Sequence, residues 1–260
     1  MSKPFTHFVA SLALVVAVCL ASCASAPPAT LEDSLNLIHK RALKRHVEWL
    51  AHDDREGRMT GEAGYDRSAA YVAGQLASMG VTPAGVGGWY QQVPLRSFRA
   101  TNAASTFVIH RDGADEALTY REDFAVLADP VRGAYQVRAE VVYAGYGVHA
   151  PDVGYSDYGG IDVRGKIVAI YSGAPESLDD EQRAFYASSS AKRGELAARG
   201  AVGIISLRSR KREARSPWEE SKKRIDSRAS MTWVNPDGEA ARYFPDIEAA
   251  AYLSPGAAER

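Results

Sequence analysis

The chain has 260 residues, a formal net charge of −1, a hydrophobic fraction of 46% and a charged fraction of 24%. These values are typical of a globular protein with one large domain or two ordinary ones. The near-neutral charge argues against a general role at nucleic acids or membrane surfaces. The only cysteines are Cys19 and Cys23, so the sequence after them has neither a disulfide nor a thiolate metal site.

A targeting segment is predicted at the start of the chain. Lys3 is followed by an apolar run from Phe8 to Leu20, which is shorter than the ~20 residues of a comfortable membrane span. The run ends in Leu20-Ala21-Ser22-Cys23. Small residues before a cysteine in this position resemble the lipobox of bacterial lipoproteins.

The lipobox resemblance implies a signal peptide over residues 1–22, a lipid on Cys23 and a tether over residues 23–30. It implies export and lipid anchoring to the bacterial cell envelope, with the outer membrane favoured because Ala24 and not an acidic residue follows the cysteine. The alternative is an ordinary secretory signal that is cleaved within residues 24–27.

A first helix is predicted from about Leu31 to about Ala51. Thr30 and Asp33 have the spacing of a capping box at its start. The helix has an apolar stripe formed by Leu35, Ile38, Ala42 and Trp49.

A charged, glycine-rich loop and a second helix follow. The loop contains Glu56-Gly57-Arg58, and the helix is predicted from Asp66 to Gly80. Its apolar face repeats at three- and four-residue steps, at Ala69, Val72, Leu76 and Met79. On composition alone the loop is a surface turn between two helices.

The loop, the helix and the following Met-Gly-Val-Thr-Pro-Ala-Gly resemble the N-terminal segment of the zinc metallopeptidases of family twenty-eight in clan MH. That family includes bacterial leucine aminopeptidases and glutamate carboxypeptidase. Residues 90–98 resemble the first strand of its catalytic domain, so the resemblance covers residues 31–106. It implies that Glu56 and Arg58 border the cleft of the parent enzyme, and that the full-length enzyme uses two zinc ions.

The pattern then changes to short strands. Residues 107–109 precede the turn signal Asp112-Gly113, and residues 120–127 are predicted to form the return strand. Further strands are predicted at residues 141–143, 167–171 and 202–207, with a helix from Lys192 to Arg199. Strand, helix and strand at this spacing predict a crossover unit with one short parallel pair.

Residues 120–254 resemble a protease-associated domain, which in this peptidase family is often inserted after the first catalytic strand. The resemblance is carried by residues 144–175 and 191–207. The order of the two segments along the chain matches the family. Together they predict an α/β (α+β) fold, in which N-terminal helices and a first strand precede a β-rich domain with short helices.

A basic segment follows at residues 208–228, with nine Lys or Arg against four acidic residues. Trp218 has no aromatic neighbours of the kind that stack on bases. The segment is therefore predicted to be a solvated loop or helix face, and the chain is predicted not to bind nucleic acid.

Zinc ligands of the expected order are missing. In the family they follow the inserted domain, beginning with His-x-Asp at a strand end. His110 with Asp112, His52 with Asp54, and the pair Glu219-Glu220 imitate such motifs, but the last histidine is His149. We therefore predict no catalytic residue and no metal ligand in this chain.

Three interpretations remain open. The chain is a truncated or fragmentary zinc aminopeptidase that lacks its zinc site, or an exported lipoprotein whose protease-associated domain binds peptides or another protein without catalysis. The third interpretation is a degenerate relative with a structural role. No Gly-x-Ser-x-Gly elbow and no phosphate-binding glycine loop is present.

Overall fold

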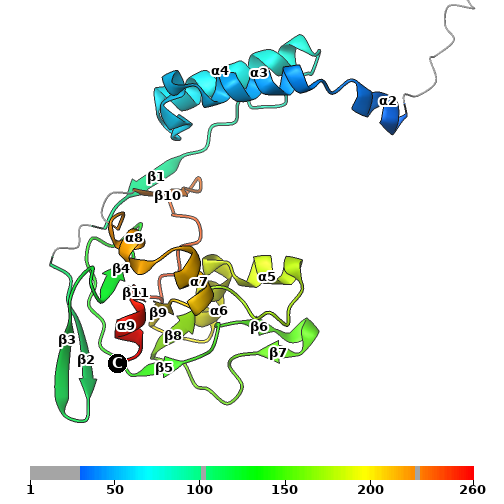
Figure 1. Ribbon diagram of the computed structural model, residues 1–260. Helices are drawn as coiled ribbons and strands as arrows, with labels where there is room; N and C mark the ends of the chain where they lie inside the picture. Colours follow the sequence, from blue (N-terminus) through cyan, green and yellow to red (C-terminus); the bar gives the residue numbers. More distant parts are fainter. Residues whose placement is uncertain (1–29, 101–103, 226–228) are drawn as a thin grey trace, which may run out of the picture. The chain divides into compact units, whose positions relative to one another are not determined.

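A computed structural model describes residues 30–100, 104–225 and 229–260. The predicted signal peptide, Cys23 and almost all of the tether lie outside these residues. The chain divides into two compact units, with the boundary between Gln91 and Gln92. The described part has no helix that is long and apolar enough to cross a membrane. Figure 1 shows N-terminal helices followed by a β-rich region with short helices, which confirms the predicted mixed α/β class.

The described residues of the first unit form four helices and one isolated bridge between Gly85 and Gly88. The helices are α2 (Leu31–Asn36), α3 (Lys40–Ala51), the 3₁₀ helix η1 (Asp53–Arg58) and α4 (Ala63–Ser78). The capping box of Thr30 and Asp33 is formed. The single helix predicted over residues 31–51 is wrong, because the chain breaks at residues 37–39. The short α2 buries no residue, so no packing holds it in line with α3.

The end of α4 agrees with the sequence pattern. Gly80 has φ +76°, and the amide of Val81 donates to the carbonyl of Leu76, as in a helix stop that uses a left-handed residue. Several large residues of this helix and its neighbours stay exposed, among them Leu43, Val47, Val72 and Met79. The apolar stripes of this unit are therefore only partly covered.

The second unit is built on a five-stranded sheet in the order β4-β11-β9-β8-β5. Its strands are β4 (Phe124–Val126), β5 (Val141–Tyr143), β8 (Ile167–Tyr171), β9 (Gly203–Leu207) and β11 (Ala249–Leu253). β4 is antiparallel to β11, and the other neighbours are parallel. The sheet therefore has three parallel pairs, whereas the sequence pattern predicted one. The pair of β9 with β11 joins strands that are separated by 41 residues of sequence, so a local pattern does not indicate it.

Smaller elements surround this sheet. They are the antiparallel pair β1 (Leu95–Phe98) with β10 (Ser230–Trp233), the hairpin β2 (Phe107–Arg111) with β3 (Ala114–Leu118), and the pair β6 (His149–Ala150) with β7 (Tyr155–Ser156). The helices are η2 (Pro151–Val153), α5 (Asp180–Tyr186), α6 (Ser189–Ala198), α7 (Arg210–Arg215), α8 (Trp218–Lys222) and α9 (Pro255–Ala258).

Two strand predictions need correction. The return strand of the hairpin is β3, not residues 120–127, because the two-residue turn Asp112-Gly113 leaves no room for a longer loop. Within residues 120–127, β4 pairs with β11 instead. The first strand is also shorter than predicted, because only residues 95–98 of the range 90–98 pair with β10.

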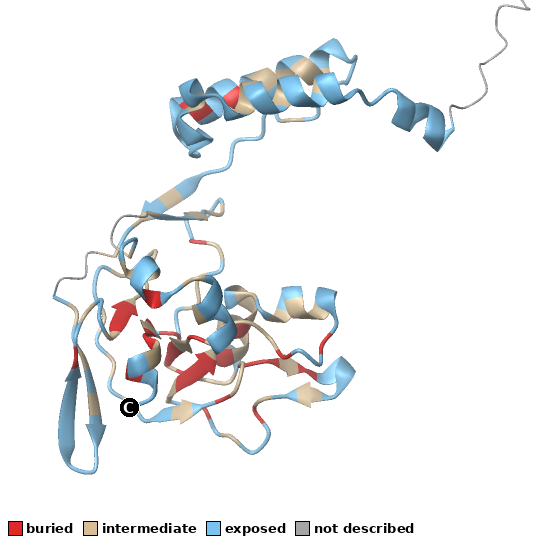
Figure 2. Cartoon of the chain, in the orientation of Figure 1, coloured by how far each residue is buried: buried red, intermediate tan, exposed pale blue. Residues whose placement is uncertain are grey.

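The core lies on both faces of the five-stranded sheet, and Figure 2 shows buried residues along its strands. Val168 and Ile204 belong to one cluster, together with Leu196 of α6. Ala169 and Ile205, the next residues along the same strands, belong to a second cluster with Phe124 of β4. This alternation is the two-residue period of strands that are covered on both faces.

Candidate functional site

Glu56 and Arg58, the residues that the family resemblance places at a cleft, lie in η1 of the first unit. Both have left-handed backbones, with φ +48° and +55°, on either side of Gly57. The Arg58 guanidinium donates to the carbonyl of Leu50, and the carboxylate of Glu56 lies 3.6 Å from the Arg67 guanidinium. Both side chains therefore serve local contacts, and their role at a cleft stays a prediction.

Stacked side chains hold this loop in place. The Trp49 and Tyr71 rings stack with centroids 3.9 Å apart, and the Arg55 guanidinium lies 3.8 Å from the Trp49 ring centroid. The Tyr71 hydroxyl is 2.7 Å from Nδ1 of His46. An added Cβ on Gly64 would lie 2.0 Å from the carbonyl oxygen of Arg55, so the close approach of loop and helix requires glycine at this position.

The residue pairs that imitate zinc motifs do not form a metal centre. His110 bonds through Nδ1 to Asp115 across the hairpin, whereas Asp112 has φ +52° at its turn. His52 lies beside Asp54 at the start of η1. Residues 30–100, 104–225 and 229–260 contain no group of three or more His, Cys, Asp or Glu side chains that could hold a metal ion. The two zinc ions that the family implies therefore do not fit the described residues.

The pair Glu219-Glu220 is also engaged elsewhere. The Glu219 carboxylate lies 2.8 Å from the ammonium of Lys222, and that of Glu220 lies 2.6 Å from the ammonium of Lys223. Both pairs join residues three apart along the chain. The two carboxylates therefore bind neighbouring lysines instead of sharing one site.

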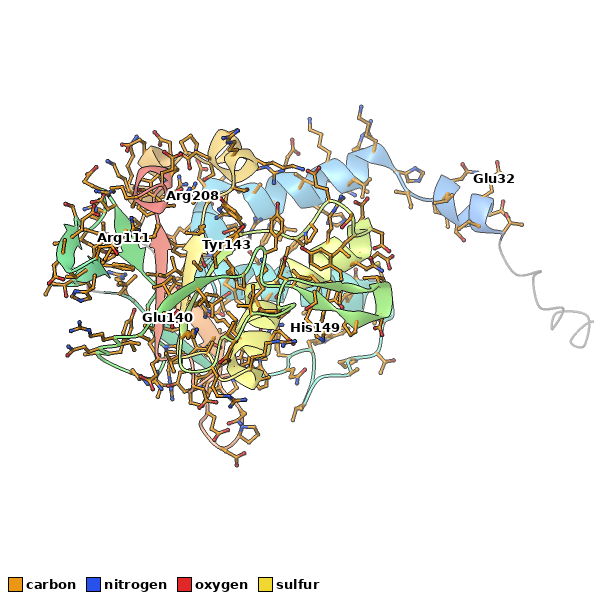
Figure 3. The ribbon with its side chains drawn as sticks, turned by 90° about the horizontal axis from the view of Figure 1, so that it is seen from below. Glu32, Arg111, Glu140, Tyr143, His149 and Arg208 are labelled. Atoms are coloured by element: carbon orange, nitrogen blue, oxygen red, sulfur yellow. The ribbon has the colours of Figure 1, made fainter. Side chains whose placement is uncertain are left out.

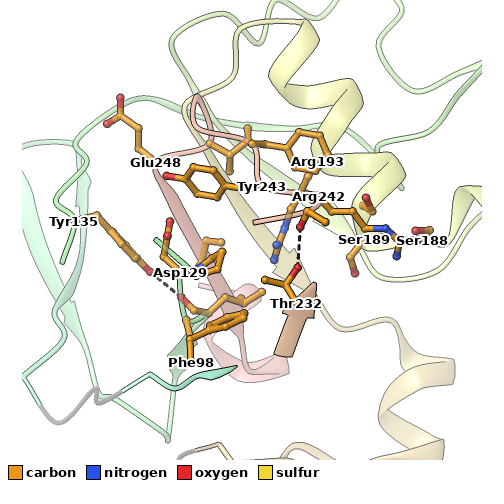
Figure 4. Close-up of a pocket in the computed structure, with 18 residues that line it drawn as sticks. Phe98, Asp129, Tyr135, Ser188, Ser189, Arg193, Thr232, Arg242, Tyr243 and Glu248 are labelled. Atoms are coloured by element: carbon orange, nitrogen blue, oxygen red, sulfur yellow. Dashed lines mark hydrogen bonds between the residues drawn. The ribbon is translucent and has the colours of Figure 1, made fainter. Parts of the chain in front are cut away.

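A pocket of about 350 Å³ lies within the second unit (Figure 4). It is formed where the ends of β1 and β4, the strand β10, the start of β11 and the start of α6 meet. Its apolar wall is formed by Phe98, Leu127, Pro130, Tyr243, Phe244 and Ile247. Gly194 allows Phe244 to pack on α6, because an added Cβ would lie 3.3 Å from the Phe244 ring. The volume is in the range of small-molecule sites.

Polar groups are fixed around the same pocket. The Tyr135 hydroxyl lies 3.3 Å from the carbonyl of Ala250, and the Thr232 hydroxyl donates to the carbonyl of Ala241 over 2.9 Å. Oδ1 of Asp129 accepts the amides of the two residues after Pro130, each over 2.7 Å. These bonds set the positions of the polar walls before any ligand arrives.

Opposite charges face each other in the pocket. Asp129 and Tyr135 lie on one side in Figure 4, with Arg193 and Arg242 toward the other. Burial raises the pKa of Tyr135, and the Asp129 charge adds to this, whereas the Arg193 charge opposes it. Tyr135 is therefore a neutral hydroxyl at physiological pH that lies within the fields of both charges.

The basic segment after β9 is folded, and its prediction as a solvated face is wrong at two positions. Arg208, labelled in Figure 3, and Trp218 are buried. Glu213 accepts from Nε of Arg208 and from the amide of Trp218, each over 2.7 Å. Burial of the Trp218 indole removes a large apolar area from water. The charged residues on either side of Trp218 along the chain gave no indication of this burial.

A buried lysine lies at the end of β8. Lys192 of α6 donates to the carbonyl of Tyr171 over 2.9 Å and also to that of Gly173. Burial lowers the pKa of its ammonium group to about 8, while the charge of Asp157 opposes this. Because its donors are used by two backbone carbonyls, Lys192 fixes the turn after β8.

The chain matches no known protein-family model, and a search of curated proteins finds no significant match. Its function therefore has to be inferred from its residues and their geometry. The pocket was not predicted from the sequence. Its lining comes from five separated segments between residues 98 and 250, and the pairings of β1 with β10 and of β4 with β11 help to bring them together.

Proposed function

We propose that the second unit is a peptide-binding domain of the protease-associated type, and that the pocket around Arg193 is its binding site. The observation that carries the proposal is the pocket itself, which combines an apolar wall with fixed polar groups of both signs. Peptides present apolar side chains, backbone amides and terminal charges at short spacing. A site for such a ligand needs these same three kinds of surface.

Filling the pocket tests the proposal. Ala128 lines it, so Ala128→Trp in the full chain is expected to abolish the binding of trileucine, followed by isothermal titration calorimetry. Ala114→Trp is the matched control, because Ala114 is exposed on the β2–β3 hairpin and should leave affinity unchanged. Binding that survives Ala128→Trp in a folded protein would contradict the proposal.

A second candidate function is supported by the order of the two segments along the chain. A peptidase-like N-terminal segment followed by a protease-associated domain is the arrangement of the metallo-aminopeptidases that the sequence resembles. On that reading the chain contributes peptide binding to such an enzyme, and hydrolysis needs zinc ligands that the described residues do not form.

Hydrolysis of leucine p-nitroanilide with added zinc tests whether the chain by itself forms a catalytic metal site. The full chain alone is expected to show no turnover, and calorimetry should find no zinc site tighter than micromolar. Turnover that a chelator removes and zinc restores would show a catalytic metal site in this chain. In that case His110→Ala would reveal whether the hairpin histidine takes part.

A further inference from the structure

Two arginines, Arg193 and Arg242, line the pocket, and Arg193 is the less exposed of the two. It lies in the first half of α6 and is partly buried. Among the residues that the structure describes, no carboxylate forms an ion pair with the Arg193 guanidinium. The guanidinium also forms no hydrogen bond with any of these residues. Two other arginines that are buried or partly buried have carboxylate partners, since the Arg199 guanidinium lies 2.6 Å from Glu195 and the Arg208 guanidinium lies 2.7 Å from Glu213.

The neighbouring groups favour an anion at this position. Arg242 also lines the pocket and adds a second positive charge. Ser188, Ser189 and Ser190 line it as well, with hydroxyl groups that can donate. A guanidinium presents parallel N–H donors whose geometry matches a carboxylate.

The opposite wall disfavours an anion and therefore gives the pocket a direction. Asp129 carries a negative charge there, and its Oδ1 already accepts two backbone amides. The Tyr135 hydroxyl is directed to backbone carbonyls. An anionic group entering the pocket is thus stabilised only on the arginine side.

Apolar side chains line the same pocket. Phe98, Leu127 and Phe244 line the pocket together with Arg193. A ligand that suits this arrangement places one charged carboxylate next to apolar groups within a few ångströms. The C-terminal residue of a peptide with an apolar side chain has this composition, whereas inorganic anions lack the apolar part.

We propose that the pocket recognises the free C-terminal carboxylate of short apolar peptides through Arg193. The proposal rests on the proposed peptide-binding function and specifies which end of the peptide is bound. Arg193 holds the terminal carboxylate, the exposed Arg242 adds positive charge, and the apolar wall contacts the last side chain. Asp129 keeps the carboxylate on the arginine side.

The test compares three ligands with four proteins by calorimetry. The ligands are trileucine, trileucine amide, and the amide of leucyl-glutamyl-leucine, whose only carboxylate is a side chain. The proteins are the full chain, Arg193→Gln, Arg193→Lys and Arg210→Gln. Arg210 is an exposed arginine of α7 that does not line the pocket, so Arg210→Gln is the matched control.

Amidation of trileucine is expected to weaken binding to the full chain by at least about tenfold, as the loss of a charge-assisted hydrogen bond does. The same amidation should have little effect on Arg193→Gln, because the partner of the carboxylate is already gone. Arg193→Lys should lie between them, because lysine keeps the charge without the paired donors. The Arg210→Gln protein should behave as the wild type.

Each other outcome overturns a defined part of the account. If trileucine and its amide bind the wild type equally, C-terminal recognition is wrong while peptide binding stands. If the glutamyl amide binds as tightly as trileucine, the site reads a side-chain carboxylate and not the terminus. If none of the three binds, the proposed function itself fails. The three ligands can be compared on the wild type alone, so the proposal remains testable even if a variant does not fold.

Discussion

The Trp218 indole N–H donates to the carbonyl of Arg121 over 2.9 Å, which joins two residues that are 97 positions apart. Trp218 begins α8, and Arg121 lies in the turn before β4. The Arg208 guanidinium lies 5.7 Å from the Trp218 ring centroid. The basic segment is therefore anchored to the edge of the five-stranded sheet and is a structural part of the second unit.

Trp218→Phe tests this anchor. The phenyl ring keeps most of the apolar contact but cannot donate, so the free energy of unfolding is expected to fall by about 1–2 kcal/mol. Trp218→Ala should cost about 3–5 kcal/mol, because it also leaves a cavity. Urea unfolding measures both. Trp233→Phe is the control, since Trp233 is half exposed, and a larger effect there than at Trp218 would disprove the anchor.

Two glycines of α4 allow a matched test of the first unit. Gly64→Ala should locally unfold η1 and the start of α4, because its Cβ would meet the carbonyl of Arg55. Gly74→Ala meets no atom within 4 Å and should stabilise the helix by about 0.5–1 kcal/mol. Amide hydrogen exchange in α4 is the measurement. Equal protection in the two variants would show that the loop does not pack on the helix as described.

Lys192 gives a pH-dependent prediction. Its folded pKa of about 8 lies below the ordinary 10.5, so the unfolded chain binds more protons between these pH values. The contribution of Lys192 to stability therefore rises with pH from about 8 to 10.5, by roughly 3 kcal/mol. Below pH 8 the cost of the buried charge is fully present.

Lys192→Met removes this titration. The difference in stability between wild type and variant should consequently change across pH 8 to 10.5, in favour of the wild type at the alkaline end. Urea unfolding at several pH values measures it, and Lys211→Met is the control because Lys211 is exposed. A constant difference across this range would mean that Lys192 has an unshifted pKa.

The export proposal concerns Cys23, which lies outside the described residues. Cys23→Ser should prevent lipid attachment and release the protein from membranes, because no other residue of the lipobox-like motif can carry the lipid. Cys19→Ser is the matched control and should still be lipidated. Metabolic labelling with a radioactive fatty acid distinguishes the two, and label on the Cys23→Ser protein would refute the assignment.

Local patterns predicted much of the fold. The capping box of Thr30, the helix stop at Gly80, the hairpin turn at Asp112 and the buried strands β8 and β9 all depend on neighbouring residues. Turn chemistry and apolar period act over a few positions, which is why they can be read from the sequence.

Features that depend on distant partners could not be read in this way. The pairing of β4 with β11 replaces the expected return strand, and the parallel pairing of β11 with β9 extends the sheet. The burial of Trp218 needs the carbonyl of Arg121. The pocket is the clearest case, because the residues that line it together with Arg193 come from distant segments of the chain. The sequence around Arg193 therefore does not indicate that it lines a pocket.

Nuclear Overhauser effects between trileucine and the full chain test the central claim most directly. The account predicts contacts from the C-terminal leucine methyl groups to the ring protons of Phe98, Tyr243 and Phe244, which line the pocket. These contacts should vanish in Ala128→Trp. Bound trileucine that contacts other residues, or no bound trileucine at all, would contradict the claim that this pocket is a peptide site.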